Sequence, residues 1–581
     1  MLHWFSSQFS LNLPLKDRMT ENSRRNKDLL GFFLILIILV LLNFISKFLY
    51  YRLDLTTEKR YTLSEPTREM LSGLNDVVFF KIYLEGEFPA GFRVLRNRTK
   101  EMLEEFKAVS GSNVQYEFID PNANPDKKQR KKLYRELYEL GLQPTKLEVS
   151  EKEGETQQVI FPGAVLSFKG QTGAIQLLKS RMGTSPEQML NNSVQDLEYE
   201  LADAIRKLSK PTKPAIGFLG GHGELDSLEV YDITHTLAEY YDVVLDTINH
   251  RLGSLNKYKC VVIAQPDSAW DDKDKFILDQ YIMRGGKVLW LIDPVYATMD
   301  SLRQQATTFA LPIETNLEDL LFSYGVRLNY TIIQDLQAAP IPITTGMIGN
   351  QPQMKFYPWY YFPIFFPESK HPIVNNLNGI KSEFASTMDT LSVAGVKKDI
   401  LLQTSKYSRI QQAPTRISLN ILGAPPEEKQ FDKQNLITGV LLEGMFPSAF
   451  TDLIPSSIKE SKEIGFMAKS VKTAMIVVAD GDIIKNGVNR KNGSYYALGY
   501  DRYTQRDYGN KNFILNCINY LCDDSGMISA RARELKLRLL DRKKVEREKT
   551  KWQVINLALP IGLLVLVGGF FFWRRKRKYG R

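Results

Sequence analysis

Two long apolar runs, one near each end of the 581-residue chain, limit what the chain can fold into. The first covers residues 29–51 and begins with the unbroken apolar stretch 29–42. In the second, residues 554–573, only Asn556 is polar. About 20 apolar residues in a helix cross a bilayer, and a helix is required because lipid offers no hydrogen bonds to an open backbone. The sequence therefore predicts transmembrane helices over 29–51 and 553–573.

A cleaved signal peptide is the alternative for the first run. The run is longer than the apolar core of a signal peptide, and residues 46–52 after it contain no small-x-small cleavage site. We therefore favour an uncleaved anchor.

Basic residues beside both runs predict the orientation. The tail, residues 574–581, opens with five consecutive basic side chains, and the N-terminal segment 1–28 is also basic. Positive flanks stay in the cytoplasm, so both termini are expected there, with the large region between them on the periplasmic side of an inner membrane. Residues 526–552 carry a further basic excess, which we interpret as a juxtamembrane helix along anionic headgroups.

The net charge of +10 is concentrated in these flanking segments. It therefore favours contact with a lipid bilayer and gives no reason to expect nucleic acid as a partner. Three cysteines cannot all pair, so no disulfide framework is expected.

Between the runs, the patterning predicts an α/β fold in two parts. Residues 54–208 mix short strands with amphipathic helices and form a small α/β domain. Residues 212–525 alternate short apolar strands with helices, which is typical of a doubly wound, largely parallel sheet like that of glutamine-amidotransferase domains. A helix at 316–324 should end at Gly325, and residues 336–400 should be irregular.

The sequence lacks the residues that two kinds of catalysis require. The chain has no GxxxxGK[ST] sequence, so it lacks the phosphate cradle of a P-loop ATPase. An amidotransferase needs a cysteine on the turn after a strand, but residues 265–268 after the strand at 260–264 read Gln-Pro-Asp-Ser. The sequence therefore predicts no enzyme, no catalytic residue and no cofactor, and the cysteines read as packing residues.

The sharpest local motif is Phe-Leu-Gly-Gly-His-Gly-Glu at 218–224, at the carboxyl end of a predicted strand, where open α/β sheets bind ligands. Two aspartates end neighbouring strands at the same edge. The candidate ligand-binding residues are Gly220, Gly221, His222, Gly223, Glu224, Asp267 and Asp293. The alternative is that the glycines serve only a tight turn and the aspartates only cap loops. No HExxH sequence and no second nearby histidine is present, so no metal site is expected.

Residues 356–366 contain eight aromatic side chains in eleven positions. An exposed patch of this kind would be a partner, glycan or membrane surface, whereas a buried segment would fill a core. We favour burial, because so apolar a patch is a liability in solvent.

The order of several motifs resembles a known family. These motifs are RLDLTTEKRYTLS at 52–64, FLGGHGE at 218–224, the stretch from KNFILN to LRLLD at 511–541, and a C-terminal apolar run with a basic tail. Together they resemble GldG-type gliding-motility proteins, which belong to a wider class of auxiliary components of ABC-type transport systems. The resemblance implies a non-ATPase subunit that works with a polytopic permease and a separate P-loop ATPase in Gram-negative gliding motility.

Two other functions stay open. A free-standing tethered receptor would bind a small molecule or glycan at the 218–224 motif. An enzyme with a degenerate amidotransferase-like sheet would depend on His222 and Glu224.

Overall fold

The computed structural model describes residues 30–41, 63–151, 154–179, 186–209, 213–348, 351–523, 526 and 542–579. The chain divides into two compact units, Met1–Thr62 and Leu63–Arg581. In the first unit an apolar helix, Leu30–Leu41, is described. The other parts of the predicted first transmembrane helix, and residues 527–541 of the predicted basic segment 526–552, lie outside the described residues.

The small domain has its own sheet and core. Its elements are α2 (Glu65–Ser72), β1 (Val78–Ile82), α3 (Ala90–Val109), β2 (Val114–Phe118), α4 (Lys127–Glu139), β3 (Thr145–Glu151), β4 (Gly154–Ile160), β5 (Gly163–Phe168), β6 (Gln171–Gln176) and α5 (Pro186–Ser209). The sheet order is β2-β1-β5-β6, with β1 and β2 parallel. The helices α2, α3 and α5 contribute apolar residues to one core with this sheet. Two antiparallel hairpins, β3–β4 and β5–β6, complete the strands of this domain.

A seven-stranded sheet organises the large domain. Its strands are β7 (Ala215–Gly220), β8 (Asp242–Thr247), β9 (Cys260–Ala264), β10 (Lys287–Leu291), β19 (Val396–Gln403), β22 (Ile437–Gly444) and β23 (Thr473–Val478), in the order β19-β22-β23-β10-β9-β7-β8. The five strands from β23 to β8 are parallel, and β22 and β19 add an antiparallel edge. The strands β22 and β23, which lie late in the domain, therefore join the same sheet as β7 to β10.

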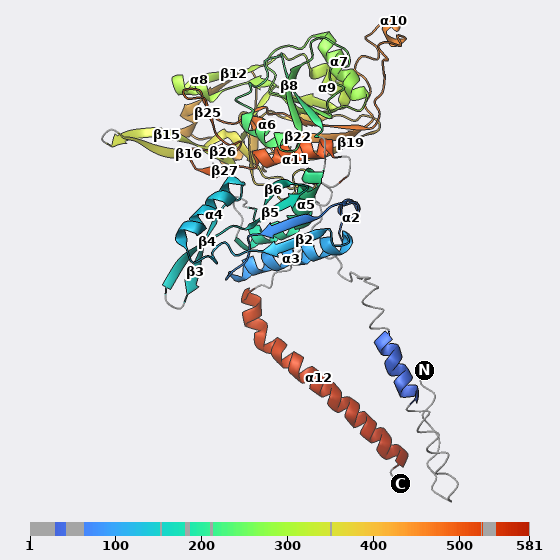
Figure 1. Ribbon diagram of the computed structural model, residues 1–581. Helices are drawn as coiled ribbons and strands as arrows, with labels where there is room; N and C mark the ends of the chain where they lie inside the picture. Colours follow the sequence, from blue (N-terminus) through green and yellow to red (C-terminus); the bar gives the residue numbers. More distant parts are fainter. Residues whose placement is uncertain are drawn as a thin grey trace, which may run out of the picture. The chain divides into compact units, whose positions relative to one another are not determined.

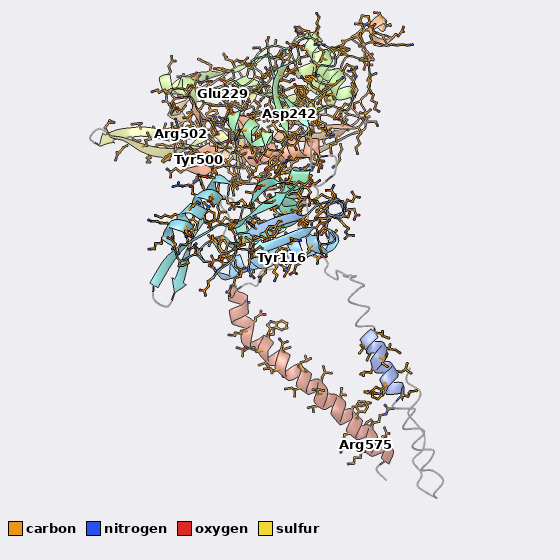
Figure 2. The ribbon with its side chains drawn as sticks, in the orientation of Figure 1. Tyr116, Glu229, Asp242, Tyr500, Arg502 and Arg575 are labelled. Carbon is orange, nitrogen blue, oxygen red and sulfur yellow. The ribbon has the colours of Figure 1, made fainter. Side chains whose placement is uncertain are left out.

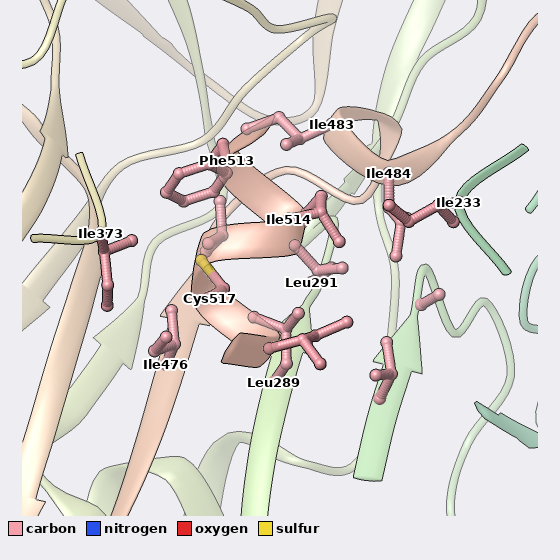
Figure 3. Close-up of a cluster of buried hydrophobic side chains, with 14 of the residues drawn as sticks. Ile233, Leu289, Leu291, Ile373, Ile476, Ile483, Ile484, Phe513, Ile514 and Cys517 are labelled. Carbon is pink, nitrogen blue, oxygen red and sulfur yellow. The ribbon is translucent and has the colours of Figure 1, made fainter. Parts of the chain in front are cut away.

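Helices cover both faces of this sheet. On one face, α6 (Tyr231–Ala238) and α11 (Asn510–Cys522) share a core with alternate strand residues. Figure 3 shows Phe513, Ile514 and Cys517 of α11 against Leu289 and Leu291 of β10. On the other face lie α7 (Asp272–Met283) and α9 (Glu318–Tyr324). All three cysteines are buried and unpaired, which confirms that they pack.

The sequence predicted that residues 336–400 are irregular, and this prediction was wrong. The segment contains β15 (Ala338–Ile348) and β16 (Gln351–Phe365), which form a long antiparallel hairpin seen clearly in Figure 1. Both strands of this hairpin contain prolines, and Pro340 lies opposite Pro358. Proline removes a backbone donor and therefore hides a strand from sequence patterning.

The aromatic run lies mostly on β16 and is buried over its second half, as we favoured. Trp359, Tyr361, Phe362 and Phe365 are buried, whereas Phe356 is 45% exposed. Trp359, Tyr361 and Phe362 pack in a core of their own, whereas Phe365 packs in the sheet core with α6 and α11.

Short elements complete the large domain. They are β11 (Val295–Tyr296), α8 (Met299–Gln304), β12 (Thr307–Pro312), β13 (Val326–Leu328), β14 (Thr331–Asp335), β17 (Ile380–Lys381), β18 (Met388–Thr390), β20 (Ser408–Gln412), β21 (Thr415–Ser418), α10 (Ser456–Lys459), β24 (Val488–Asn489), β25 (Ser494–Tyr495), β26 (Tyr500–Asp501), β27 (Arg506–Asp507) and the 3₁₀ turns Leu419–Leu422, Glu428–Gln430 and Asp482–Ile484. The C-cap of α9 is Gly325 in the left-handed region, as predicted.

The last helix, α12 (Arg542–Tyr579), contains a segment long and apolar enough to cross a membrane, Arg547–Arg577. The mean hydropathy of its most apolar window is 2.3, and none of that window is buried within the protein. Figure 2 labels Arg575 in the basic end of the helix. The predicted second transmembrane helix therefore has its counterpart in the structure by length and composition.

The packing of β10 generates a prediction. Leu289 of β10 is fully buried in the core that the sheet shares with α11. Leu289→Ala should therefore lower the free energy of unfolding by about 2–5 kcal/mol. Leu311→Ala on β12, where the side chain is half-exposed, should change it by about 0.5 kcal/mol or less. Urea denaturation of the full-length protein in detergent, followed by tryptophan fluorescence, measures both. Equal losses of unfolding free energy in the two variants would contradict the burial of Leu289 in this core.

Candidate functional site

The predicted site lies where the parallel sheet reverses its winding. After β7 the chain crosses to α6 on one face, and after β9 it crosses to α7 on the other. The strands β7 and β9 are neighbours, so their outgoing loops diverge at their carboxyl ends. In open α/β sheets this switch point is where ligands bind. The two loops carry the 218–224 motif and residues 265–268.

The backbone conformation of the motif explains why two of its positions are glycine. Gly221 (φ +116°) and Gly223 (φ +78°) occupy backbone regions that side chains rarely adopt. The backbone N–H groups of Asp267 and Ser268 donate to the carbonyl oxygen of His222 at 3.1 and 3.0 Å. A Cβ on Gly223 would lie 1.5 Å from Oδ1 of Asp267. The two loops are therefore fastened to each other, and the tight-turn interpretation holds for these two glycines.

His222 is held between two carboxylates. Its side chain is buried, its Nδ1 lies 3.4 Å from Oε1 of Glu224, and its Nε2 lies 3.3 Å from Oδ2 of Asp274. The imidazole stacks on Trp270 with a centroid distance of 4.0 Å and an interplanar angle of 13°. The second oxygen of Glu224, Oε2, accepts a hydrogen bond from the backbone N–H of His222 at 2.6 Å.

These neighbours set the protonation of His222. Burial acts to lower its pKa, but the adjacent carboxylates of Glu224 and Asp274 outweigh burial, so the pKa of His222 is raised above its ordinary value. An imidazolium on the face of an indole gains a further cation–π attraction. The arrangement favours a positively charged histidine that stiffens this part of the rim.

Asp293 belongs to a second cluster. It accepts hydrogen bonds from Nε2 of Gln265 at 2.5 Å and from the backbone N–H of Gly481 at 2.6 Å. The loop after β23 brings Asp480 and Asp482 to the same place, and Lys485 lies 3.5 Å from Asp482. The seven candidate residues therefore separate into a histidine cluster at β7 and β9 and an acidic cluster at β10 and β23.

Burial sets the electrostatics of the acidic cluster. It raises the pKa of Asp293, and it raises the pKa of Asp482 to about 7. For Asp480, burial and the nearby charges of Asp293 and Asp482 raise the pKa well above its ordinary value. The cluster therefore holds protons that carboxyl groups in water would lose.

Several residues at the rim were missed from the sequence. Asp480 and Asp482 follow directly after a predicted strand, and the shared edge of parallel strands would have predicted their approach to Asp293. Trp270 and Asp274 lie at the start of α7. His250 comes from the loop after β8 and reaches Asp274 with its Nδ1 at 3.1 Å. We predicted that no second histidine lies near His222. This prediction was wrong, because His222 and His250 both contact Asp274.

Comparison with known families assigns the large domain. Residues 213–517 match the family model described as "ABC-type uncharacterized transport system". The chain belongs to this family. A second model, a domain of unknown function (DUF7088), matches residues 57–167 in the small domain. Membership in the ABC-type transport family and the apolar α12 together indicate association with a membrane.

Other proteins resemble this family member more distantly. An uncharacterized protein of Borreliella burgdorferi (strain ATCC 35210 / DSM 4680 / CIP 102532 / B31) is 22% identical over 417 residues, which cover 69% of this chain and 74% of that protein. Among solved structures, the N-terminal domain of mmIFT52 is 12% identical with a TM-score of 0.30, and covers 53% of this chain and 97% of that one. A ThuA-like protein of Parabacteroides merdae is 9% identical with a TM-score of 0.25, and covers 54% of this chain and 90% of that one. Likenesses this weak carry no argument about fold or activity.

The contact between the two loops predicts the effect of Gly223→Ala. The substitution places a side chain at φ +78° and forces Asp267 away from its hydrogen bond with Ser268, which measures 2.8 Å. We expect a loss of stability about 1 kcal/mol greater than that of Gly395→Ala, the matched control. Gly395 has φ +82° with no atom within 4 Å of its added Cβ.

A double variant separates the two causes. Measured by urea denaturation in the background of Asp267→Ala, Gly223→Ala should cost only about as much as Gly395→Ala costs in the wild type. Equal losses for the two single glycine variants would contradict the loop contact.

Proposed function

We propose that this protein is a membrane-anchored, non-ATPase auxiliary subunit of an ABC-type transport system that presents its large α/β region to a partner. The observation that supports this proposal best is the combination of the family match with α12, whose apolar surface has no protein packed against it. Exposed apolar helices of this length find their solvent in a bilayer.

The proposed orientation follows from charge. In α12 the apolar segment is followed by Arg574, Arg575, Lys576 and Arg577, and such clusters stay in the cytoplasm. With the first apolar run as a second span, both termini would be cytoplasmic and the region between them periplasmic. The protein would then be a two-pass protein of an inner membrane.

The energy for transport would come from other subunits. The 581-residue sequence contains no GxxxxGK[ST] motif. We therefore propose a separate P-loop ATPase and a polytopic permease as partners. A domain tethered at both ends follows movements of the permease, so ATP-driven motion could be passed outward without chemistry in this subunit. The resemblance to gliding-motility proteins places this coupling, as a proposal, in surface motility.

We also propose that the subunit is not an enzyme. Strand β9 is followed by residues that include no cysteine, and Cys260 itself is buried within the strand. The raised pKa of the buried Cys260 thiol, caused first by burial, keeps it protonated and unreactive.

Affinity purification tests the proposal. The full-length protein, extracted from native membranes in mild detergent, should bring with it a polytopic permease and a P-loop ATPase. A control variant replaces residues 554–573 by leucines, which keeps the anchor and removes the specific side chains of the span. We expect the control to remain in the membrane and to recover less permease, because specific packing holds helices together in lipid.

Recovery of the wild-type protein alone, in detergent that preserves other ABC complexes from the same membranes, would contradict the subunit proposal.

A tethered ligand-binding receptor is the second candidate, favoured by one observation. A pocket of about 300 Å³ lies at the loop after β8, and it is lined by Asp246, Thr247, Ile248, Asn249, Arg251, Leu252, Gly253, Ser254 and Lys257. This volume is at the lower end of the range for small-molecule sites. Purification without partners, together with binding of a small molecule that Lys257→Ala abolishes, would favour the receptor over the subunit.

A further inference from the structure

His250 is presented to the first turn of α7 by an unusual loop. Asn249 (φ +54°) and His250 (φ +50°) both lie in the left-handed region. Nδ1 of His250 lies 3.1 Å from Oδ1 of Asp274 and 3.4 Å from Oδ2 of Asp271. His250 and Asp271 are each about half exposed, whereas Asp274 is buried. An ion from solvent can therefore reach the three side chains, one of which is fixed by burial.

The spacing of these groups matches that of ligands on one small cation. One donor atom from each of His250, Asp271 and Asp274 lies within 4.8 Å of the other two. Ligands about 2.0–2.1 Å from a tetrahedral zinc ion lie about 3.3 Å from one another. The two distances from Nδ1 of His250, 3.1 and 3.4 Å, are close to this value.

Helix capping accounts for part of this cluster only. Oδ1 of Asp271 accepts the backbone N–H of Asp274 at 2.9 Å, which is an ordinary N-cap. Capping leaves Oδ2 of Asp271 directed at His250. It also gives no reason for two histidines to contact the two oxygens of one buried carboxylate, Asp274.

His222 would hold Asp274, one of the ligands of such a site, in place. Its side chain is 9% exposed, and its Nε2 lies 3.3 Å from Oδ2 of Asp274, the oxygen that does not face His250. Trp270 and Glu224 fix the ring on its other sides. Both atoms of the contact with Glu224, Nδ1 of His222 and Oε1 of Glu224, are buried. A histidine that orients a ligating carboxylate is a recurring feature of metal sites.

We propose that His250, Asp271 and Asp274 bind a divalent transition-metal ion, with zinc as the best fit, and that His222 is the positioning residue for Asp274. Imidazole selects zinc and its neighbours over magnesium and calcium, which prefer oxygen ligands alone. Three protein ligands leave a fourth position open to water or to a carboxylate or phosphate ligand. The ion would fasten the loop after β8 to α7 at the carboxyl edge of the sheet. The site is independent of the proposed transport function.

Zinc titration of the full-length protein tests this site. The protein is stripped with a chelator in detergent, exchanged into metal-free buffer and titrated with ZnCl₂ in a calorimeter. We expect one strong site in the wild type and a loss of affinity of at least about 100-fold in His250→Ala and in Asp271→Asn, since each removes a ligand. Asparagine caps a helix as well as aspartate does, so Asp271→Asn keeps α7 intact. His222→Gln should lose about 10–100-fold in zinc affinity, because it removes the side chain that orients Asp274.

Two matched controls identify the site. His235→Ala removes an exposed histidine on α6, and Asp272→Asn removes an exposed carboxylate next to Asp271. Both should bind zinc as the wild type does. Near-UV circular dichroism should show that every variant is folded. Absence of a strong site in the wild type, or equal affinity in His250→Ala and His235→Ala, would overturn the proposal.

Discussion

Burial of both faces of the seven-stranded sheet is the interaction on which the large domain depends. The central strands β9, β10 and β23 are apolar along almost their whole length, with side chains alternating between the α6/α11 core and the α7/α9 core. At about 25 cal/mol per Å² of apolar surface, two such cores are the largest favourable term available to this domain. Because both faces are closed, polar and charged groups gather at the strand ends.

The carboxyl edge of the sheet shows the consequence. At one strand pair, His222 lies between the carboxylates of Glu224 and Asp274. At the next, Asp293 accepts hydrogen bonds from Gln265 and the backbone of Gly481, and Lys485 pairs with Asp482. Such clusters are costly when a partner is removed, because the charge left behind stays buried. The rim is therefore a rigid, charged surface, suited to holding an ion or contacting a partner.

Sequence patterning was reliable where a single local signal dominated. Short apolar runs predicted the parallel strands, and a glycine in the left-handed region ended α9 at Gly325 as expected. The β15–β16 hairpin was missed because its prolines break the strand pattern. The motif at 218–224 was placed correctly at a strand end. Its partners Asp274 and His250 were not found, since their approach depends on which strands are neighbours, and a local pattern does not contain that order.

The membrane gives the remaining constraint. Among the described residues, none buries the apolar window of α12, and the family is one of transport systems. We therefore propose that α12 crosses a bilayer and holds the sheet rim on the far side from the basic tail. Topology reporters test this claim most directly, with one reporter fused after Arg581 and another inserted beside Ala338 on the β15–β16 hairpin. The account predicts a cytoplasmic signal at Arg581 and a periplasmic signal beside Ala338. Signals from the same side of the membrane would contradict it.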